Sequence, residues 1–186
     1  MSEKKLFEDK RVGDVYNRST IATHDINVVL VHPQIPQNTG NISRLCVGSG
    51  TRLHLIHPLG FSTDSTMLKR AGLDYWENLQ VEEHESLEAF FEAHPDAAEK
   101  GWFASSKVQR PYTSAPFEKG CYLFFGAETS GLPKELLTEQ QSRCITIPIL
   151  GPVRSFNLAN SVGIVLFEAI RQIQTEVFTW KNNTTT

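Results

Sequence analysis

The sequence predicts an α/β protein with a mostly parallel sheet and helices on both faces. Two observations lead to this fold class. Short, continuous apolar runs such as residues 26–31 and 121–126 are typical of strands that are buried on both faces. These runs alternate along the chain with segments of helical composition, and this alternation favours a parallel sheet covered by helices.

Five segments are expected to form the strands of this sheet. The first is a continuous β-branched run, and the second ends at Pro58, because proline lacks the N–H that a central strand needs. In chain order, the predicted strands are INVVLV (26–31), RLHLIHP (52–58), GWFAS (101–105), CYLFFG (121–126) and ITIPIL (145–150).

Five other segments are expected to form helices. Glycines close the first, Ser, Thr and Asp residues can cap the second, and the last is long and apolar. In chain order, the predicted helices are TGNISRLCVGSG (39–50), STDSTMLKRAGLDY (62–75), SLEAFFEAH (86–94), KELLTEQ (134–140) and FNLANSVGIVLFEAIRQIQ (156–174).

The chain is expected to form one domain with a short extension at each end. Residues 1–25 carry five basic and five acidic side chains with few large apolar ones, which is typical of a flexible N-terminal extension. An arm that touches a partner is the alternative interpretation. Residues 26–180 are predicted to be the folded domain, and residues 181–186, KNNTTT, a disordered tail.

Composition indicates a cytoplasmic protein with reduced thiols. No run approaches the roughly 20 apolar residues that span a bilayer, and the N-terminus has no apolar signal segment. The three cysteines are widely spaced and form no CxxC pair, which disfavours a disulfide framework and a structural zinc site. Because the net charge is −3, any contact with nucleic acid must come from a local patch.

Three predicted strands are followed by loops of unusual composition. Ligands of parallel α/β sheets bind at the carboxyl ends of the strands, which makes these loops the candidate site. None of them contains G-x-x-x-x-G-K-[ST] or G-x-G-x-x-G, so neither a P-loop nor a dinucleotide fingerprint is present. The loops are HPQIPQNTGNISRLCVGSG (32–50), FFGAETSGLPKE (124–135) and IPILGPVRSFNLANS (147–161).

Taken singly, the polar residues of these loops also have ordinary interpretations. Arg44 on a short helix would usually be a solvated surface residue. Ser155 and Asn157 precede an apolar helix, where both are common capping residues, although capping alone explains only one of them. The six histidines are scattered, and because none pairs with a nucleophile at motif spacing, we expect structural or surface roles for them.

Together, the loops resemble those of the SPOUT (SpoU–TrmD) class of RNA methyltransferases, and most closely its TrmL-type tRNA 2′-O-methyltransferases. The resemblance covers residues 26–174, and the order and spacing of the motifs fit throughout. The motifs that carry it are IPQNTGNISRLC, LHLIHPLGF, RAGLDY, FFGAETSGLP and IPILGPVRSFNLANSVGIVLFEAIRQ.

This resemblance implies an α/β sheet whose C-terminal segment forms a trefoil knot around S-adenosyl-L-methionine. It also implies a homodimer whose two subunits jointly bind the anticodon stem-loop of a tRNA. The implied reaction moves a methyl group to the ribose 2′-hydroxyl, most closely that of cytidine or uridine at wobble position 34. S-adenosyl-L-homocysteine would be the product, and no metal would be required.

The resemblance also implies roles for individual residues. Arg44 would contact the RNA and assist deprotonation of the 2′-hydroxyl, by orienting the hydroxyl or as a general base. The implied catalytic set is Asn38, Arg44, Glu128, Ser155 and Asn157. The implied cofactor-binding set is Ser105, Gly126, Ile147, Leu150, Ser155 and Leu158.

Three alternatives stay open. The same chemistry could act at another tRNA position or on ribosomal RNA, because Ala127 and Ser130 stand where the family commonly has proline and arginine. A catalytically silent RNA-binding relative is the second alternative. The third is an unrelated nucleotide-binding α/β protein.

Overall fold

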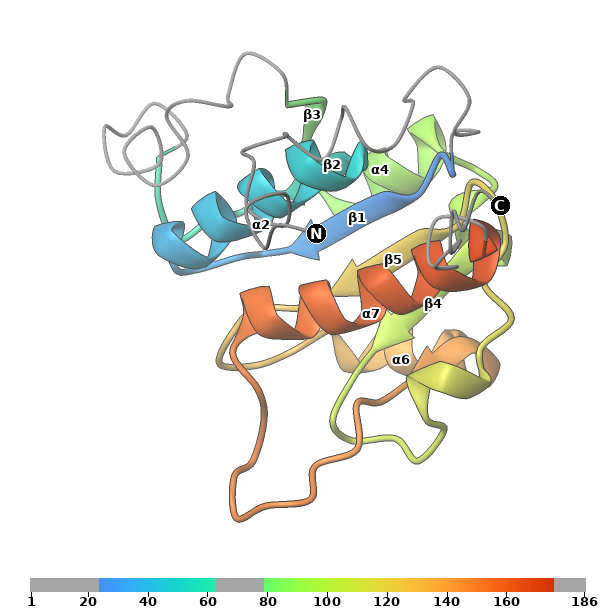
Figure 1. Cartoon of the computed structure of the whole chain (residues 1–186). Helices are drawn as coiled ribbons and strands as arrows, with labels where there is room; N and C mark the ends of the chain where they lie inside the picture. Colours follow the sequence, from blue (N-terminus) through green and yellow to red (C-terminus); the bar gives the residue numbers. More distant parts are fainter. Residues whose placement is uncertain (1–23, 63–78, 176–186) are drawn as a thin grey trace, which may run out of the picture.

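Within the part of the chain that the structure describes, the sheet has six parallel strands in the order β3-β2-β1-β5-β4-β6. The computed structural model describes residues 24–62 and 79–175, and Figure 1 shows their path. The strands are β1 (Asn27–Val31), β2 (Arg52–Ile56), β3 (Val81–His84), β4 (Gly101–Ala104), β5 (Tyr122–Phe125) and β6 (Cys144–Ile145).

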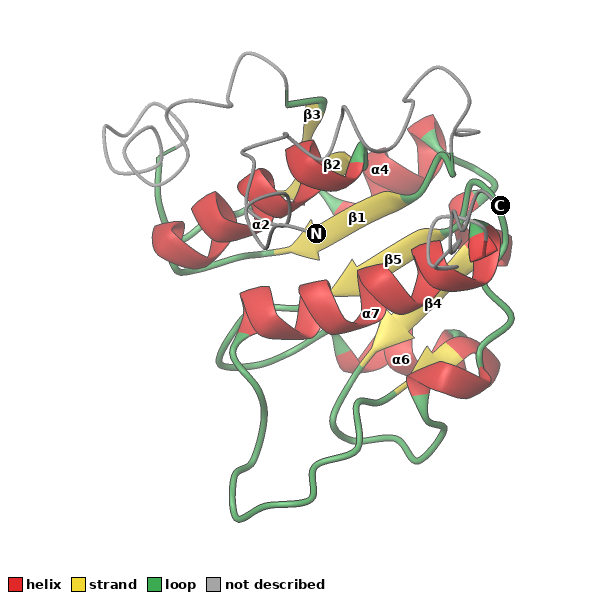
Figure 2. Cartoon of the chain, viewed as in Figure 1, coloured by secondary structure: helices red, strands yellow, loops and turns green. Residues whose placement is uncertain are grey.

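Helices cover both faces of the sheet, as Figure 2 shows. The α-helices are α2 (Pro36–Ser49), α4 (Leu87–Ala93), α5 (Ala97–Lys100), α6 (Lys134–Glu139) and α7 (Leu158–Ile173). Two short 3₁₀ helices, η3 (Tyr112–Ser114) and η4 (Gln141–Arg143), lie before β5 and β6. The predicted fold class, a parallel α/β sheet with helices on both faces, is confirmed.

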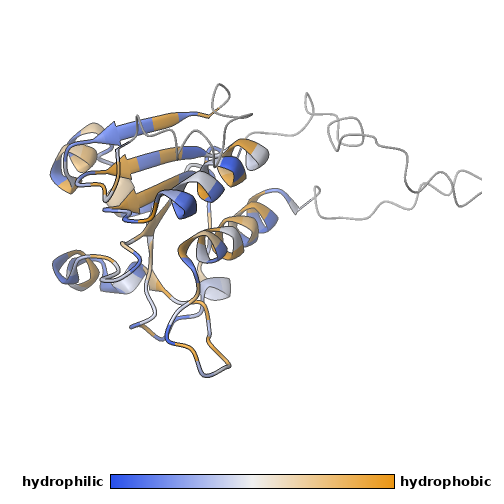
Figure 3. Cartoon of the chain, turned by 90° about the vertical axis from the view of Figure 1, so that its left-hand side faces the viewer, coloured by the Kyte–Doolittle hydropathy of each residue, from blue (hydrophilic) through white to orange (hydrophobic). Residues whose placement is uncertain are grey.

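The alternation of side chains along the strands produces two separate cores. In β1, Val28 and Leu30 pack in the core beneath α2 and α7, whereas Val29 and Val31 pack in the opposite core beneath α4 and α6. All four side chains are buried, which explains why the central strands have continuous apolar sequences. The strands at the centre of the sheet are accordingly mostly hydrophobic in Figure 3.

The strand order reverses between β1 and β5. From β1 the chain adds β2 and β3 on one side, and it then crosses to build β4, β5 and β6 on the other side. Leu30 pairs with Phe125, so the loops that follow β1 and β5 leave the sheet side by side. Such a switch point is the usual place for a ligand crevice in an open α/β sheet.

Some predicted elements differ from the structure. The predicted strand 145–150 is wrong beyond Ile145, because β6 ends there and Pro148 has no N–H to continue the ladder. Strand β3 was not predicted, because its sequence VEEH has no apolar alternation, and among the described strands it pairs with β2 alone.

Helix boundaries also shifted. Helix α2 begins at Pro36, three positions before the predicted start at residue 39, because proline suits the first turn of a helix. The predicted helix 62–75, the N-terminal extension 1–25 and the tail 181–186 lie wholly or almost wholly outside the described residues. The domain limits therefore stay predictions, and the trefoil knot is a prediction as well.

Among the residues that the structure describes, no helix combines the length and apolarity needed to cross a membrane.

Candidate active site

A cavity of about 620 Å³ opens at the carboxyl ends of the strands. The loops after β1, β4 and β5 and the segment between β6 and α7 all contribute to it. Its lining residues from the two central loops and the start of α2 are Ile35, Asn38, Phe125, Gly126, Ala127, Glu128, Thr129, Ser130 and Gly131. The remaining lining residues are Ala104, Ser105, Ser106, Lys107, Thr146, Ile147, Ile149, Arg154, Ser155, Phe156, Asn157, Leu158 and Ser161.

The Glu128 carboxylate joins the loop after β5 to the loop after β1. Its Oε2 accepts the Gln34 backbone N–H at 2.8 Å, and its Oε1 accepts the Ile35 N–H at 3.2 Å. The side-chain Nδ2 of Asn38 also donates to Oε1, at 2.9 Å. Ile35 is the N-cap of α2 and makes no side-chain cap hydrogen bond, so Glu128 supplies the acceptor that this helix end lacks.

Asn38 connects this network to the start of α7. Its Oδ1 accepts a hydrogen bond of 2.9 Å from Nδ2 of Asn157, and 119 residues separate the two along the chain. The Oδ1 of Asn157 caps α7 by accepting the backbone N–H of Ala159 at 2.9 Å. One amide therefore caps a helix and positions the buried Asn38, and this explains why a simple capping interpretation of Asn157 is incomplete.

The loop after β5 folds back on itself at Gly126. A Cβ atom at this position would lie 2.0 Å from the carbonyl carbon of Gly131 and 2.1 Å from the nitrogen of Leu132. Gly131 has φ +74°, a left-handed conformation that favours glycine, and its N–H donates to Ala127 O at 2.8 Å. The two glycines thus serve a tight backbone crossing that forms one wall of the cavity.

Most of the predicted site residues meet at this cavity. Eight of them line it: Asn38, Ser105, Gly126, Glu128, Ile147, Ser155, Asn157 and Leu158. Arg44 does not line it and lies on an exposed part of α2. Leu150 does not line it either; its side chain is 98% exposed on the loop before α7, which extends away from the sheet in Figure 1.

Several lining residues were not among the predicted site residues. Lys107 comes from the segment after β4, in which Ser105 is the one predicted site residue. Thr129 lies in the predicted site loop 124–135, and its Oγ1 donates to Oε1 of Gln34 at 2.7 Å. Arg154 stood in the third loop, but no spacing rule distinguished it from an ordinary surface arginine.

The comparison with protein families gives the identity of the fold. Residues 25–167 match the SpoU rRNA Methylase family. The chain belongs to this family. The predicted likeness to SPOUT methyltransferases is thereby confirmed. All residues that line the cavity fall within the matched range.

Individual proteins resemble the chain over most of its length. The Escherichia coli (strain K12) relative named tRNA (cytidine(34)-2′-O)-methyltransferase is 43% identical over 152 residues, which cover 80% of this chain and 94% of the relative. A Bacillus subtilis (strain 168) relative, provisionally named as the same enzyme, is 49% identical over 150 residues, or 79% of this chain and 92% of the relative.

Solved structures of RNA methyltransferases are also similar to this chain. One described as "Structural insights into the 2-OH methylation of C/U34 on tRNA" has a TM-score of 0.75 and 46% identity, and the match covers 79% of this chain and 95% of that chain. An AdoMet-bound rRNA methyltransferase from Sinorhizobium meliloti has a TM-score of 0.73 and 26% identity, over 81% of this chain and 57% of that chain.

Proposed function

We propose that this protein transfers a methyl group from S-adenosyl-L-methionine to the ribose 2′-hydroxyl of the wobble nucleotide, position 34, of a tRNA. The observation that carries the proposal is the cavity at the switch point, where Glu128, Asn38 and Asn157 form one connected network. Relatives named for this activity match the chain over about four fifths of its length.

The cavity suits the cofactor in size and in lining. Its volume of about 620 Å³ lies within the usual range for sites that bind small molecules. Ile147, Ile149 and Leu158 supply apolar surface for an adenine ring, while the strand-end loops bring backbone donors and acceptors to the same space. Lys107 and Arg154 supply cationic groups that suit a carboxylate or a phosphate.

When bound, S-adenosyl-L-methionine supplies an activated methyl group on a sulfonium. The protein must then bring the hydroxyl oxygen into line with that methyl group and accept or share the hydroxyl proton. Glu128 is fully engaged by three donors, so we assign it a positioning role: it holds Asn38 and the start of α2 against the cavity. Ser155, Asn38 and Asn157 would orient the substrate.

Arg44 is proposed to act from a second subunit. It lies on α2, which packs against α7, and Ile164 and Phe167 of α7 are 36% and 43% exposed. A homodimer that buries this apolar surface would carry Arg44 toward the partner's cavity, where its guanidinium would orient the ribose and stabilise developing negative charge. The anticodon stem-loop would bind across both subunits, in the cytoplasm.

The direct test is methylation of bulk tRNA with labelled S-adenosyl-L-methionine, followed by nucleoside mapping. We expect one labelled 2′-O-methyl nucleotide at position 34. Label at another tRNA position would contradict the wobble assignment. Cofactor binding without any transfer would favour a catalytically silent relative, and no affinity for the cofactor in calorimetry would refute the proposal as a whole.

Ribosomal RNA is the second candidate substrate. Ser130 lines the cavity where the family commonly has arginine, and a structural neighbour is named as an rRNA methyltransferase. Comparison of 2′-O-methyl sites in total RNA from wild-type and deletion strains distinguishes the two substrates, because the missing site identifies the target directly.

Arg44→Ala tests the assignment of that residue. We expect methyl transfer to fall by at least about 100-fold, while the Kd for S-adenosyl-L-methionine in calorimetry changes little. Arg44→Lys keeps the charge but not the fork of donors, and it should recover only part of the rate. An equal loss of transfer and of cofactor binding in Arg44→Ala would mean that Arg44 has a structural role.

A further inference from the structure

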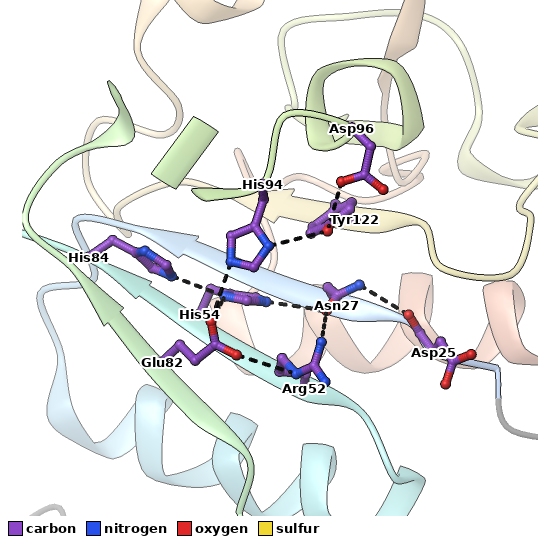
Figure 4. A network of polar contacts seen from close by, with 9 residues as sticks. All are labelled: Asp25, Asn27, Arg52, His54, Glu82, His84, His94, Asp96 and Tyr122. Atoms are coloured by element: carbon purple, nitrogen blue, oxygen red, sulfur yellow. Dashed lines mark hydrogen bonds and ion pairs between the residues drawn. The ribbon is translucent and has the colours of Figure 1, made fainter. Parts of the chain in front are cut away.

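Four potential metal ligands meet on the α4 face of the sheet, away from the cavity. The side chain of His54 projects from β2, those of Glu82 and His84 from β3, and that of His94 from the C-cap of α4 (Figure 4). One ligand atom from each of the four lies within 4.8 Å of every other. None of these residues lines the cavity.

The strand register creates this arrangement. His54 pairs with Glu82 across β2 and β3, and Glu82 and His84 are two positions apart, so all three side chains point to the same face. Helix α4 then returns across this face and delivers His94. Because the three histidines come from three elements, no short spacing motif in the sequence indicates the cluster.

Three of the six distances between the ligand atoms approach those around a tetrahedral ion, and all six are within 4.8 Å. Zinc bonds of 2.0–2.2 Å to nitrogen and oxygen place neighbouring ligand atoms roughly 3.3 Å apart. The distance from His54 Nδ1 to His84 Nε2 is 3.1 Å, and that from His94 Nε2 to Glu82 Oε2 is 3.3 Å. His54 Nδ1 lies 3.8 Å from the same Glu82 oxygen.

Hydrogen bonds behind the cluster orient His54 as a ligand. Asn27 donates its Nδ2 to the backbone oxygen of Asp25 at 3.0 Å, which identifies its Oδ1 as the atom 3.2 Å from His54 Nε2. His54 must therefore donate from Nε2. In the neutral ring, Nδ1 then carries a lone pair, and this lone pair faces His84 and Glu82 (Figure 4).

His94 is oriented in the same manner. The Tyr122 hydroxyl donates to Asp96 Oδ1 at 3.2 Å, so its oxygen accepts from His94 Nδ1 at 3.5 Å. The remaining nitrogen of the neutral His94 ring, Nε2, then turns a lone pair toward the carboxylate of Glu82. Two acceptors that face each other at 3.3 Å require a cation between them, either a proton or a metal ion.

Burial keeps His54 in the form that binds metals. Its side chain is fully buried and its Nε2 already donates to Asn27 at 3.2 Å, so a further proton on Nδ1 would place an uncompensated positive charge in the interior. A neutral imidazole is a metal ligand, whereas an imidazolium is not. Arg52 contacts the other Glu82 oxygen, Oε1, at 3.5 Å, so Oε2 stays directed at the histidines.

We propose that His54, Glu82, His84 and His94 bind one zinc ion, or a transition-metal ion of similar preference, as a structural site. Three imidazoles and one carboxylate complete a tetrahedral shell and leave no position for a substrate, which is the pattern of structural sites. The ion would join β2, β3 and α4. This link would secure β3, an edge strand whose side chains are exposed or only half-buried.

The test uses the full chain without a polyhistidine tag, stripped with a chelator and titrated with Zn²⁺ in a calorimeter. We expect one equivalent to bind. Free Zn²⁺ at a hundred times its Kd should raise Tm by about 5 to 10 °C. Co²⁺ in place of Zn²⁺ should give the intense visible absorption of tetrahedral coordination.

Three variants separate this site from surface binding. Glu82→Gln and His94→Gln each remove one ligand, and we expect both to weaken Zn²⁺ by at least about 10- to 100-fold, the loss typical even for residues behind the ligands. His57→Gln is the matched control, because it breaks the 2.9 Å pair with Glu83 at the same sheet edge but leaves the cluster intact. It should bind Zn²⁺ like the wild type.

Two outcomes would overturn the proposal. One is the absence of a bound equivalent in the wild type, which would mean that a proton alone occupies the cluster. The other is an equal affinity for Zn²⁺ in His94→Gln, Glu82→Gln and His57→Gln, which would place the ion elsewhere. Circular dichroism and S-adenosyl-L-methionine binding verify that each variant is folded, since the cofactor cavity lies apart from the cluster.

Discussion

Gly126→Ala is the substitution whose cost can be worked most directly from the structure. The added Cβ would lie 2.0 to 2.3 Å from three backbone atoms of Gly131 and Leu132. Carbon atoms that are not bonded prefer a separation of about 3.5 to 4.0 Å. The backbone at Gly126 and the backbone at Gly131 and Leu132 would therefore have to move apart by roughly 1.5 Å. No rotation of a side chain can relieve the overlap, because all three atoms belong to the backbone.

This separation should affect stability and activity differently. Overpacking of this kind costs about 1 to 3 kcal/mol, which lowers Tm but leaves a folded protein. The displaced segment carries Glu128, which holds Asn38 at 2.9 Å. Because a misplacement of about 1 Å at a reacting centre can reduce a rate by about 100-fold, we expect methyl transfer to fall by about that factor.

The assay combines thermal unfolding, calorimetry with S-adenosyl-L-methionine and single-turnover methylation of tRNA. Gly163→Ala, in helix α7, is the matched control. Its Cβ would meet only Cδ2 of Leu45 on α2, at the ordinary contact distance of 3.7 Å. This variant should be unchanged or more stable by up to about 1 kcal/mol. If Gly126→Ala bound the cofactor and transferred methyl groups as Gly163→Ala does, the crossing would not shape the site.

Three further predictions concern other parts of the molecule. Asn157→Ala should lose about 1 kcal/mol of stability, because it removes the cap of α7. Asn157→Asp should keep the cap but lose methyl transfer, because a carboxylate cannot donate a hydrogen bond to Asn38. Equal methyl transfer by Asn157→Asp and the wild type would refute the role of that donor. Glu168→Gln should cost no more than about 1 kcal/mol at pH 7, because solvent screens its half-exposed partner Arg171. The hydrogen bonds from Arg171 lower the pKa of Glu168 below its ordinary 4.5, so this contribution is complete above pH 4.5 and disappears as pH falls through the folded-state value; urea unfolding at several pH values tests it, and a difference that persists in acid would contradict it. The three cysteines are buried, so Ellman's reagent should titrate none in the native protein and three after unfolding, and fast native labelling would disprove their burial.

Patterns within short stretches of sequence determined most of the sheet. The strands at its centre, including β1 and β5, have apolar runs that admit no other environment than one covered on both faces. The edge strand β3 was missed because half its positions face solvent and its sequence VEEH has no apolar period. Strand β6 was overestimated because the apolar letters continue past Ile145 although Pro148 cannot pair.

The candidate site was predictable in its loops but not in its geometry. Eight of the predicted residues line one cavity, because the carboxyl ends of parallel strands necessarily share one edge of the sheet. The motif positions could not show that Glu128 is engaged by three donors or that Leu150 is 98% exposed. Hydrogen-bond partners 90 or more residues apart depend on how the loops cross, which no local spacing encodes.

For the histidine cluster, tertiary structure decided even more than it did for the cavity. The sequence disfavoured a structural zinc site because its cysteines do not pair, and it left His54, His84 and His94 as unrelated residues. Local sequence placed His54 in a predicted strand and His94 at the end of a predicted helix, but it did not predict β3, on which His84 stands. Only the register of β2 against β3 and the return of α4 decided that their nitrogens meet, because a contact between distant segments is a property of the packed chain and not of any segment in it.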